Sequence, residues 1–171
     1  SATPSAGSRF SGWAGEGCSG TGTCTVSMSG ARAVMATFLG SGPSRFFPLT
    51  PCRVVDTRDP AQDGLHAPIL SPTPAIRTFV IPAAHCGIPV DARALSVNYT
   101  VDATGAAGSL QAWAADEVST PIATILSFGA GRTRANNGLL ALSSGGTLSF
   151  KVRLLSAQPT HFILDVNGYF R

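Results

Sequence analysis

The stretch ALSVNYTV, residues 94–101, runs into the turn-rich span DATGAAG, residues 102–108, and this pattern decides the fold. A short run rich in β-branched and aromatic residues ends where Asp, Gly and small residues take over, which is typical of a β-strand entering a turn. The same pattern recurs along the chain from Phe46 onward. The sequence therefore predicts an all-β domain.

Seven further runs in this part of the chain are predicted strands, separated by turn-rich spans such as FGAGRT and SSGGT. The runs are CRVVDT (52–57), IRTFVI (76–81), SLQAWA (109–114), ATILSF (123–128), NGLLAL (137–142), TLSFKVRL (147–154) and HFILDV (161–166). Eight short strands at this spacing favour a jelly-roll-like β-sandwich, whose two sheets bury one face each. Segment 58–75 contains four prolines and is predicted to be an irregular loop.

Residues 1–39 are predicted to form a separate small unit. TCTVSMS (23–29) and RAVMATF (32–38) each alternate apolar and polar residues, and a Ser-Gly pair between them suits a tight turn. We therefore expect a β-hairpin. Upstream of it, Phe10 and Trp13 are expected to pack as core aromatics.

The stretch LGSGPS, residues 39–44, is rich in Gly, Pro and Ser and marks the best domain boundary. We expect a hairpin unit over residues 1–39, a linker over 40–45 and a β-sandwich over 46–171.

The composition narrows the classes of function. Only 12% of the 171 residues are charged, whereas glycine (19) and proline (12) are abundant, as in a turn-rich β protein. The net charge of +3 comes from 11 arginines and one lysine without a basic run, so nucleic acid is not an expected partner. No segment approaches the roughly 20 apolar residues of a membrane-spanning helix. The chain opens without signal-peptide features, so we expect any secretion signal to have been removed or to lie outside it.

The four cysteines pair most simply as Cys18 with Cys24 and Cys52 with Cys86, one bridge in each predicted domain, although three connectivities are possible. Zinc sites prefer two to four residues between paired cysteines, whereas the intervals here are 5 and 33 and the histidines are scattered. A thioredoxin-type site needs Cys-x-x-Cys at the start of a helix. We therefore favour structural disulfides formed in an oxidising compartment, with no metal site.

Residues 1–38 resemble the second half of a divergent internalin-type B-repeat. Pro-x-x-Gly-Ser-x-Phe-x-Gly-Trp, the cysteine loop and a closing Val-x-Ala-Thr-Phe appear in order. The resemblance implies a small β-grasp-like module that acts as a spacer or adhesive element. A full repeat begins several strands earlier. The resemblance therefore implies a chain cut from a longer parent, or missing strands that another molecule supplies at an exposed edge.

Residues 46–171 resemble an accessory β module that recurs at the ends of secreted bacterial proteins. The resemblance is carried by FPLTPCRVVDTR, FVIPAAHCGIP, ALSVNYTV, LSFGAGRTRANN and ILDVNGYF. It implies an extracellular or cell-surface location more firmly than any chemistry.

Motifs for catalysis are missing from the sequence. Neither the Gly-x-Ser-x-Gly elbow of α/β hydrolases nor a phosphate-binding Gly-x4-Gly-Lys-Ser/Thr loop occurs. A Ser-His-Asp site would need His66, His85 or His161 to meet its partners in the folded chain, which spacing cannot test. We expect a protein that is not an enzyme and needs no cofactor.

The densest polar cluster is RVVDTRDPAQDG, residues 53–64. Asp56, Asp59 and Asp63 offer oxygen ligands for calcium, but their spacing departs from the Asp-x-Asp-x-Asp-Gly loop. The alternative is an Arg–carboxylate network in which Asp56 and Arg58 hold neighbouring strands.

Four further residues are candidates for contacts with a glycan or with a protein interface. Arg132 and Arg134 lie near a turn, where such residues also satisfy backbone groups. Trp113 and Tyr99 would form a stacking platform for a sugar if they are exposed, although packing is favoured for Trp113.

The leading hypothesis is a non-enzymatic extracellular structural or adhesive protein. It would associate through strand edges with copies of itself or with other cell-surface components, and repeated pairing would make it a fibre subunit. The alternative hypothesis is a carbohydrate-binding accessory module of a secreted enzyme. A hydrolase built on the sandwich is a third hypothesis.

Overall fold

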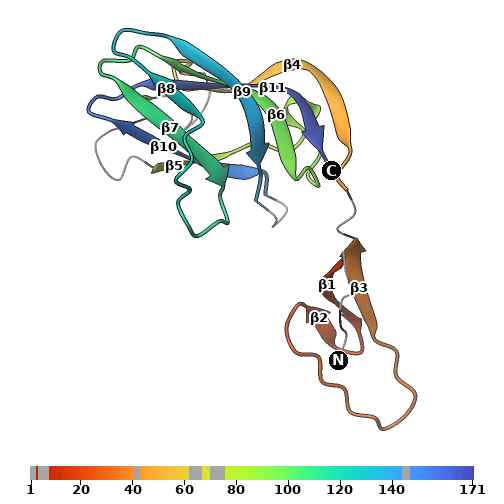
Figure 1. Cartoon of the computed structure of the whole chain (residues 1–171). Coiled ribbons are helices and arrows are strands. Elements are labelled where there is room, and N and C mark those ends of the chain that lie inside the picture. The colour runs from red at the N-terminus through yellow and green to blue at the C-terminus, as the bar shows by residue number, and fades with distance from the viewer. Residues whose placement is uncertain (1–2, 4–7, 41–42, 62–66, 70–75, 144–146) are drawn as a thin grey trace. The chain divides into compact units, whose positions relative to one another are not determined.

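The computed structural model describes residues 3, 8–40, 43–61, 67–69, 76–143 and 147–171. It divides the chain into two compact units, Ser1–Ser44 and Arg45–Arg171. This boundary falls within the segment expected to be a linker. Strands dominate both units, and the described residues contain no α-helix (Figure 1). The predicted all-β class is confirmed.

The first unit is a three-stranded antiparallel sheet of order β2-β1-β3. Strand β1 spans Ser8–Gly15, β2 spans Cys18–Gly20 and β3 spans Met35–Gly40. The central strand is therefore β1, which contains a bulge between Phe10 and Gly12 where it pairs with β3.

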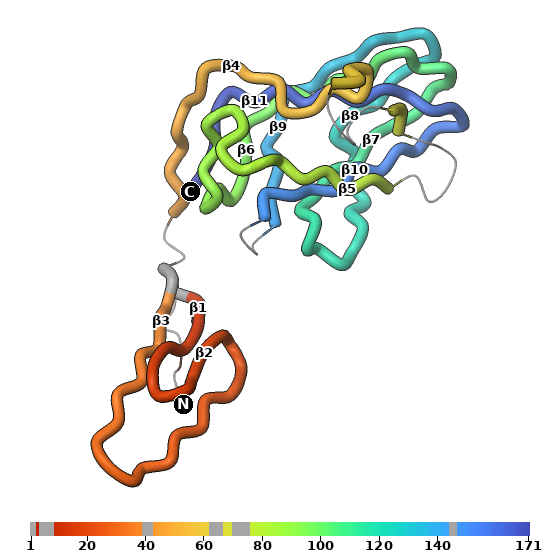
Figure 2. Tube along the Cα trace, turned by 180° about the vertical axis from the view of Figure 1, so that it is seen from behind, coloured from red at the N-terminus to blue at the C-terminus, as the bar shows by residue number. Residues whose placement is uncertain are grey.

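The prediction that residues 23–29 and 32–38 form a hairpin is wrong, because these two segments do not pair. Residues 21–34 contain no strand, and Figure 2 shows them as a long loop that connects β2 to β3. The chain then returns at Met35 to pair with β1.

Aromatic side chains explain why β3 selects β1 as its partner. The ring of Phe10 lies 5.0 Å from that of Trp13 and 5.6 Å from that of Phe38, measured between centroids. Residues 23–29 contain no aromatic side chain and cannot supply such cross-strand contacts. Phe10 and Trp13 therefore pack, as expected, but they remain half-buried and do not form a buried core.

The second unit is a sandwich of two four-stranded antiparallel sheets, with orders β4-β11-β6-β9 and β5-β10-β7-β8. All eight predicted strands are present, some with shifted ends. They are β4 (Phe46–Asp56), β5 (Ile76–Val80), β6 (Ala94–Asp102), β7 (Gly108–Ala114), β8 (Leu126–Phe128), β9 (Arg134–Ala141), β10 (Ser149–Ser156) and β11 (His161–Phe170). A short 3-10 turn, η1 (His85–Gly87), precedes β6.

Alternation along the strands builds the core. In β6, Leu95, Val97, Tyr99 and Val101 are buried, while the residues between them are partly exposed. Phe79 of β5 stacks on Phe150 of β10 at 5.3 Å and contacts Phe162 of β11, in the opposite sheet, at 5.6 Å. The apolar faces of the two sheets therefore cover each other.

The ends of the second unit are paired with each other. The backbone N–H of Arg45 donates to the carbonyl of Arg171 at 2.8 Å, and the N–H of Arg171 donates back at 3.2 Å. Thus the first and last residues of the sandwich lie side by side.

No helix in the described part of the chain has the length and apolar character needed to cross a membrane.

We predict that Phe150→Ala lowers the free energy of unfolding by about 3–5 kcal/mol, because the ring is fully buried against Phe79. Chemical denaturation followed by fluorescence measures the change. Val80→Ala in the neighbouring strand is the control, since half of that side chain is exposed, and it should change stability by less than about 1 kcal/mol. Equal losses in the two variants would contradict the assigned core.

Candidate functional site

The outer edge of β3 is the least protected strand edge among the described residues. Its sequence, MATFLG, contains no charged residue and no proline over six residues. In the sandwich, the edge strand β4 contains two prolines, β5 contains Arg77 and β9 begins with Arg134, whereas β8 is only three residues long. Charges, prolines and short length are the usual means by which edges avoid pairing with other chains.

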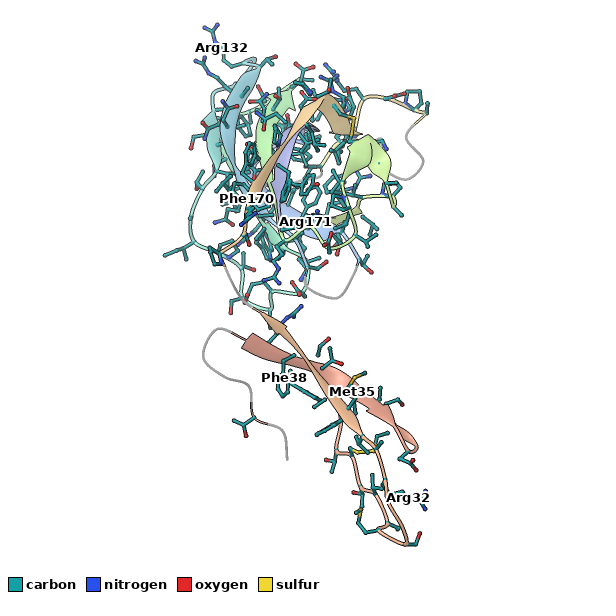
Figure 3. All side chains as sticks on the ribbon, turned by 90° about the vertical axis from the view of Figure 1, so that its right-hand side faces the viewer. Arg32, Met35, Phe38, Arg132, Phe170 and Arg171 are labelled. Atoms are coloured by element: carbon teal, nitrogen blue, oxygen red, sulfur yellow. A yellow bond between two sulfur atoms is a disulfide. The ribbon has the colours of Figure 1, made fainter. Side chains whose placement is uncertain are left out.

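The faces of the first sheet are also poorly covered. None of residues 9–38, whose exposure is described, is buried. Met35 and Phe38, labelled in Figure 3, are 62% and 36% exposed. Trp13 is held in place because its Nε1–H donates to the carbonyl of Gly22 at 2.9 Å. The described side chains of this three-stranded sheet therefore gain little from apolar burial within their own chain.

Both predicted disulfides are present, Cys18–Cys24 and Cys52–Cys86, and no cysteine is free. The first bridge joins β2 to the start of the strand-free segment 21–34. The second joins β4 to the η1 turn of the sandwich.

An ion-pair network covers part of the outer face of the sheet β4-β11-β6-β9. Arg58 donates from Nη2 to Asp56 Oδ2 and from Nη1 to Asp102 Oδ2, both at 2.9 Å. Arg53 donates from Nε to Asp165 Oδ1 at 2.8 Å and from Nη1 to Asp56 Oδ2 at 3.1 Å. The network ties β4 to β11 and to β6, as the Arg–carboxylate alternative expected.

Two carboxyl groups of this network have lowered pKa values. Hydrogen bonds from Arg58 lower the pKa of Asp56 from 3.8 to about 2, against the opposing effect of burial. Hydrogen bonds from Thr133 and Arg58 lower the pKa of Asp102. Both groups are therefore stabilised in the ionised state.

Two of the three candidate calcium ligands, Asp56 and Asp59, accept hydrogen bonds from within the chain. Both carboxylate oxygens of Asp56 accept hydrogen bonds from arginine, which occupies the positions a cation would need. Asp59 uses Oδ1 to accept the backbone N–H of Ala61. Asp63 lies outside the described residues.

The aromatic platform does not form, and the packing that was favoured for Trp113 is what the structure has. Tyr99 points into the core, where burial raises the pKa of its hydroxyl, and Trp113 is 7% exposed. Trp113 lies on the outer face of its sheet, beside Lys151 of β10, whose Nζ donates to the carbonyl of Glu117 in the β7–β8 connection. Neither ring is available for a sugar to stack on.

Arg132 and Arg134 remain exposed, and Figure 3 shows the side chain of Arg132 pointing away from the sandwich. Thr104 organises the turn that carries Arg132. Its Oγ1 accepts the N–H of Arg132 at 2.9 Å, and its own carbonyl accepts the N–H of Gly131 at 2.7 Å. The turn therefore has a structural explanation, and its arginines remain candidate contacts.

The two histidines of the described chain contact different groups. Nδ1 of His161 lies 3.1 Å from Oγ1 of Thr57, but Thr57 is 1% exposed and its hydroxyl also accepts the N–H of Phe162. His85 lies beside the carbonyl of Arg53. His66 lies outside the described residues. Burial of Thr57 makes it unsuitable as a nucleophile for an external substrate.

A comparison of the chain with protein-family models, curated proteins and solved structures finds no match. Any functional conclusion therefore depends on the geometry described above.

We predict that the Asp56 network stabilises the fold in a pH-dependent way. Because the pKa of Asp56 is lower in the folded chain, its contribution is complete above the ordinary carboxyl pKa of 3.8 and is lost as the pH falls towards 2. Asp56→Asn should remove about 2 kcal/mol of unfolding free energy at pH 7 and flatten the dependence between pH 4 and 2.

Thermal unfolding measured from pH 7 to pH 2 tests this prediction. Asp91→Asn is the matched control, since Asp91 is largely exposed and lies 3.9 Å from its partner Arg171. An identical pH profile for wild type and Asp56→Asn would show that the network does not stabilise the fold.

Proposed function

We propose that this chain is a non-enzymatic extracellular structural or adhesive protein that joins copies of itself through the outer edge of β3. The observation that carries the proposal is the combination of a six-residue edge without charge or proline with a sheet in which none of residues 9–38, the part whose exposure is described, is buried. Pairing at that edge satisfies backbone N–H and C=O groups and covers part of the exposed apolar surface.

A second copy of this chain is the occupant that the edge fits. When two β3 strands pair antiparallel about a two-fold axis, each copy presents the same surface to the other and the contact closes on itself. Growth into a fibre would require a second edge, and the opposite edge of this sheet is β2, which has only three residues. The geometry therefore favours a dimer over a fibre.

The covalent structure supports the extracellular part of the proposal. Two disulfides and no free cysteine are typical of chains that fold in an oxidising compartment. The carbohydrate-binding alternative has less support, because Trp113 and Tyr99 are buried.

We predict that the double variant Met35→Lys and Thr37→Lys shifts the protein to the monomer. Both side chains are exposed and alternate with Ala36 and Phe38, so they lie on the face opposite the aromatic cluster. Lysines at this edge repel each other across a two-fold contact and remain solvated in the monomer. Sedimentation velocity over a range of concentrations should show at least a tenfold weaker association.

Val118→Lys with Ile122→Lys is the matched control. These side chains are 95% and 97% exposed in the β7–β8 connection, so the control removes apolar surface without touching a strand edge. The proposal fails if the wild type stays monomeric at high concentration, or if the control reduces association as much as the edge variant does.

A further inference from the structure

The side chains of Cys52, His85 and Cys86 converge on one point of the sandwich. Both sulfur atoms and a ring nitrogen of His85 lie within 4.8 Å of one another, and all three residues are half-buried. The carbonyl oxygen of Arg53 lies next to all of them, 3.1 Å from His85 Nε2, 3.5 Å from Cys86 Sγ and 3.9 Å from Cys52 Sγ. The two sulfur atoms are joined in the Cys52–Cys86 disulfide, and only after its reduction would they become thiolates, which together with imidazole are ligands that zinc prefers.

The contact with Arg53 orients the His85 ring. A carbonyl oxygen carries no hydrogen, so Nε2 must be the donor in this hydrogen bond. In the neutral ring the lone pair is then on Nδ1. Metal-binding histidines commonly donate a ring N–H to a backbone carbonyl, and such a contact orients the ring.

The loop that carries His85 and Cys86 is anchored on both sides. Ile81 and Ile88 are buried in the core. Three backbone hydrogen bonds close the loop between them: His85 N to Pro82 O, Gly87 N to Ala84 O and Ile88 N to His85 O. These contacts do not involve the disulfide, so the loop that carries His85 and Cys86 should keep its conformation when the sulfurs are no longer bonded.

We propose that the reduced protein binds one Zn²⁺ ion through the thiolates of Cys52 and Cys86 and a ring nitrogen of His85. The fourth position is then open to water, as in three-ligand zinc sites. The same two sulfurs form either the bridge or the metal site, so the site exists only in the reduced chain.

The reduction that prepares the site can be written in full for a phosphine reductant. One phosphine and one water break the S–S bond, supplying two electrons and two protons, and leave two thiols and a phosphine oxide. Binding of Zn²⁺ then releases the two thiol protons to solvent, because the metal binds thiolates.

The other disulfide is an internal control. Cys18 and Cys24 are also bridged, but among the described residues no histidine or carboxylate joins them in a ligand cluster. A chain that keeps only this pair should bind zinc far more weakly, since two thiolates alone do not complete the ligand set.

The test uses Co²⁺ as a coloured substitute for Zn²⁺ in the full chain carrying Cys18→Ser and Cys24→Ser. After reduction with a phosphine under nitrogen, we expect one equivalent of Co²⁺ to give the charge-transfer and visible bands of tetrahedral cobalt–thiolate binding. Added Zn²⁺ should bleach those bands. Zn²⁺ should also raise the melting temperature of the reduced protein, a readout that detects binding to the folded state.

Three variants in this background identify the ligands. His85→Ala should weaken Co²⁺ binding by at least about tenfold. His161→Ala, which removes a histidine from another part of the sandwich, should leave it unchanged. Cys52→Ser with Cys86→Ser should abolish it. The proposal is overturned if the parent shows no cobalt–thiolate bands, or if His85→Ala binds Co²⁺ as tightly as the parent.

Discussion

The contact of Phe79 with Phe150 in its own sheet and with Phe162 in the opposite sheet is the interaction on which the sandwich depends. It lies where the apolar faces of the two sheets meet. Each sheet alone would expose a row of apolar residues to water, and each covers the other. Among the described residues, the first unit shows no second layer of this kind. Its sheet carries a disulfide and a small aromatic cluster, and in our proposal it is also stabilised by another copy of the chain.

Ion pairs, and not apolar contacts, join strands on the outer face of one sheet of the sandwich. The network of Arg53, Asp56, Arg58, Asp102 and Asp165 joins three strands of one sheet, β4, β6 and β11, and each carboxylate in it is matched by a guanidinium. Such a network fixes the relative positions of strands without adding apolar area. It also explains why a segment rich in aspartate does not have to bind a cation.

The sequence alone was sufficient for the sandwich because its strands carry a period-two pattern and end at recognisable turns. The same reasoning failed in residues 21–34. That segment also alternates, but alternation does not specify a partner, and the rings of Phe10 and Phe38 decided the pairing. Gly15 also constrains this region. Its φ is 100°, and a Cβ atom at this position would lie 2.6 Å from the carbonyl oxygen of Ala33, so only glycine fits. Trp113 was ambiguous because a residue on the outer face of a sheet can still be buried, as this one is.

The spacing of residues in the sequence did not indicate the cluster of Cys52, His85 and Cys86. The interval of 33 residues between the cysteines argued against a metal site, but a bridge across such an interval brings in the neighbours of each cysteine as well. His85 precedes Cys86 directly in the chain, so the predicted pairing already contained the signal that a third ligand would lie near the sulfurs.

The pairing of Arg45 with Arg171 has a mechanical consequence. These residues begin and end the sandwich on adjacent antiparallel strands, so a tensile load applied between them would open the β4–β11 hydrogen bonds one pair at a time. Peeling of this kind resists force weakly. The opening would stop at Cys52, where β4 is covalently attached to the η1 turn. The disulfide would therefore limit how far a pulled chain lengthens before its core is loaded.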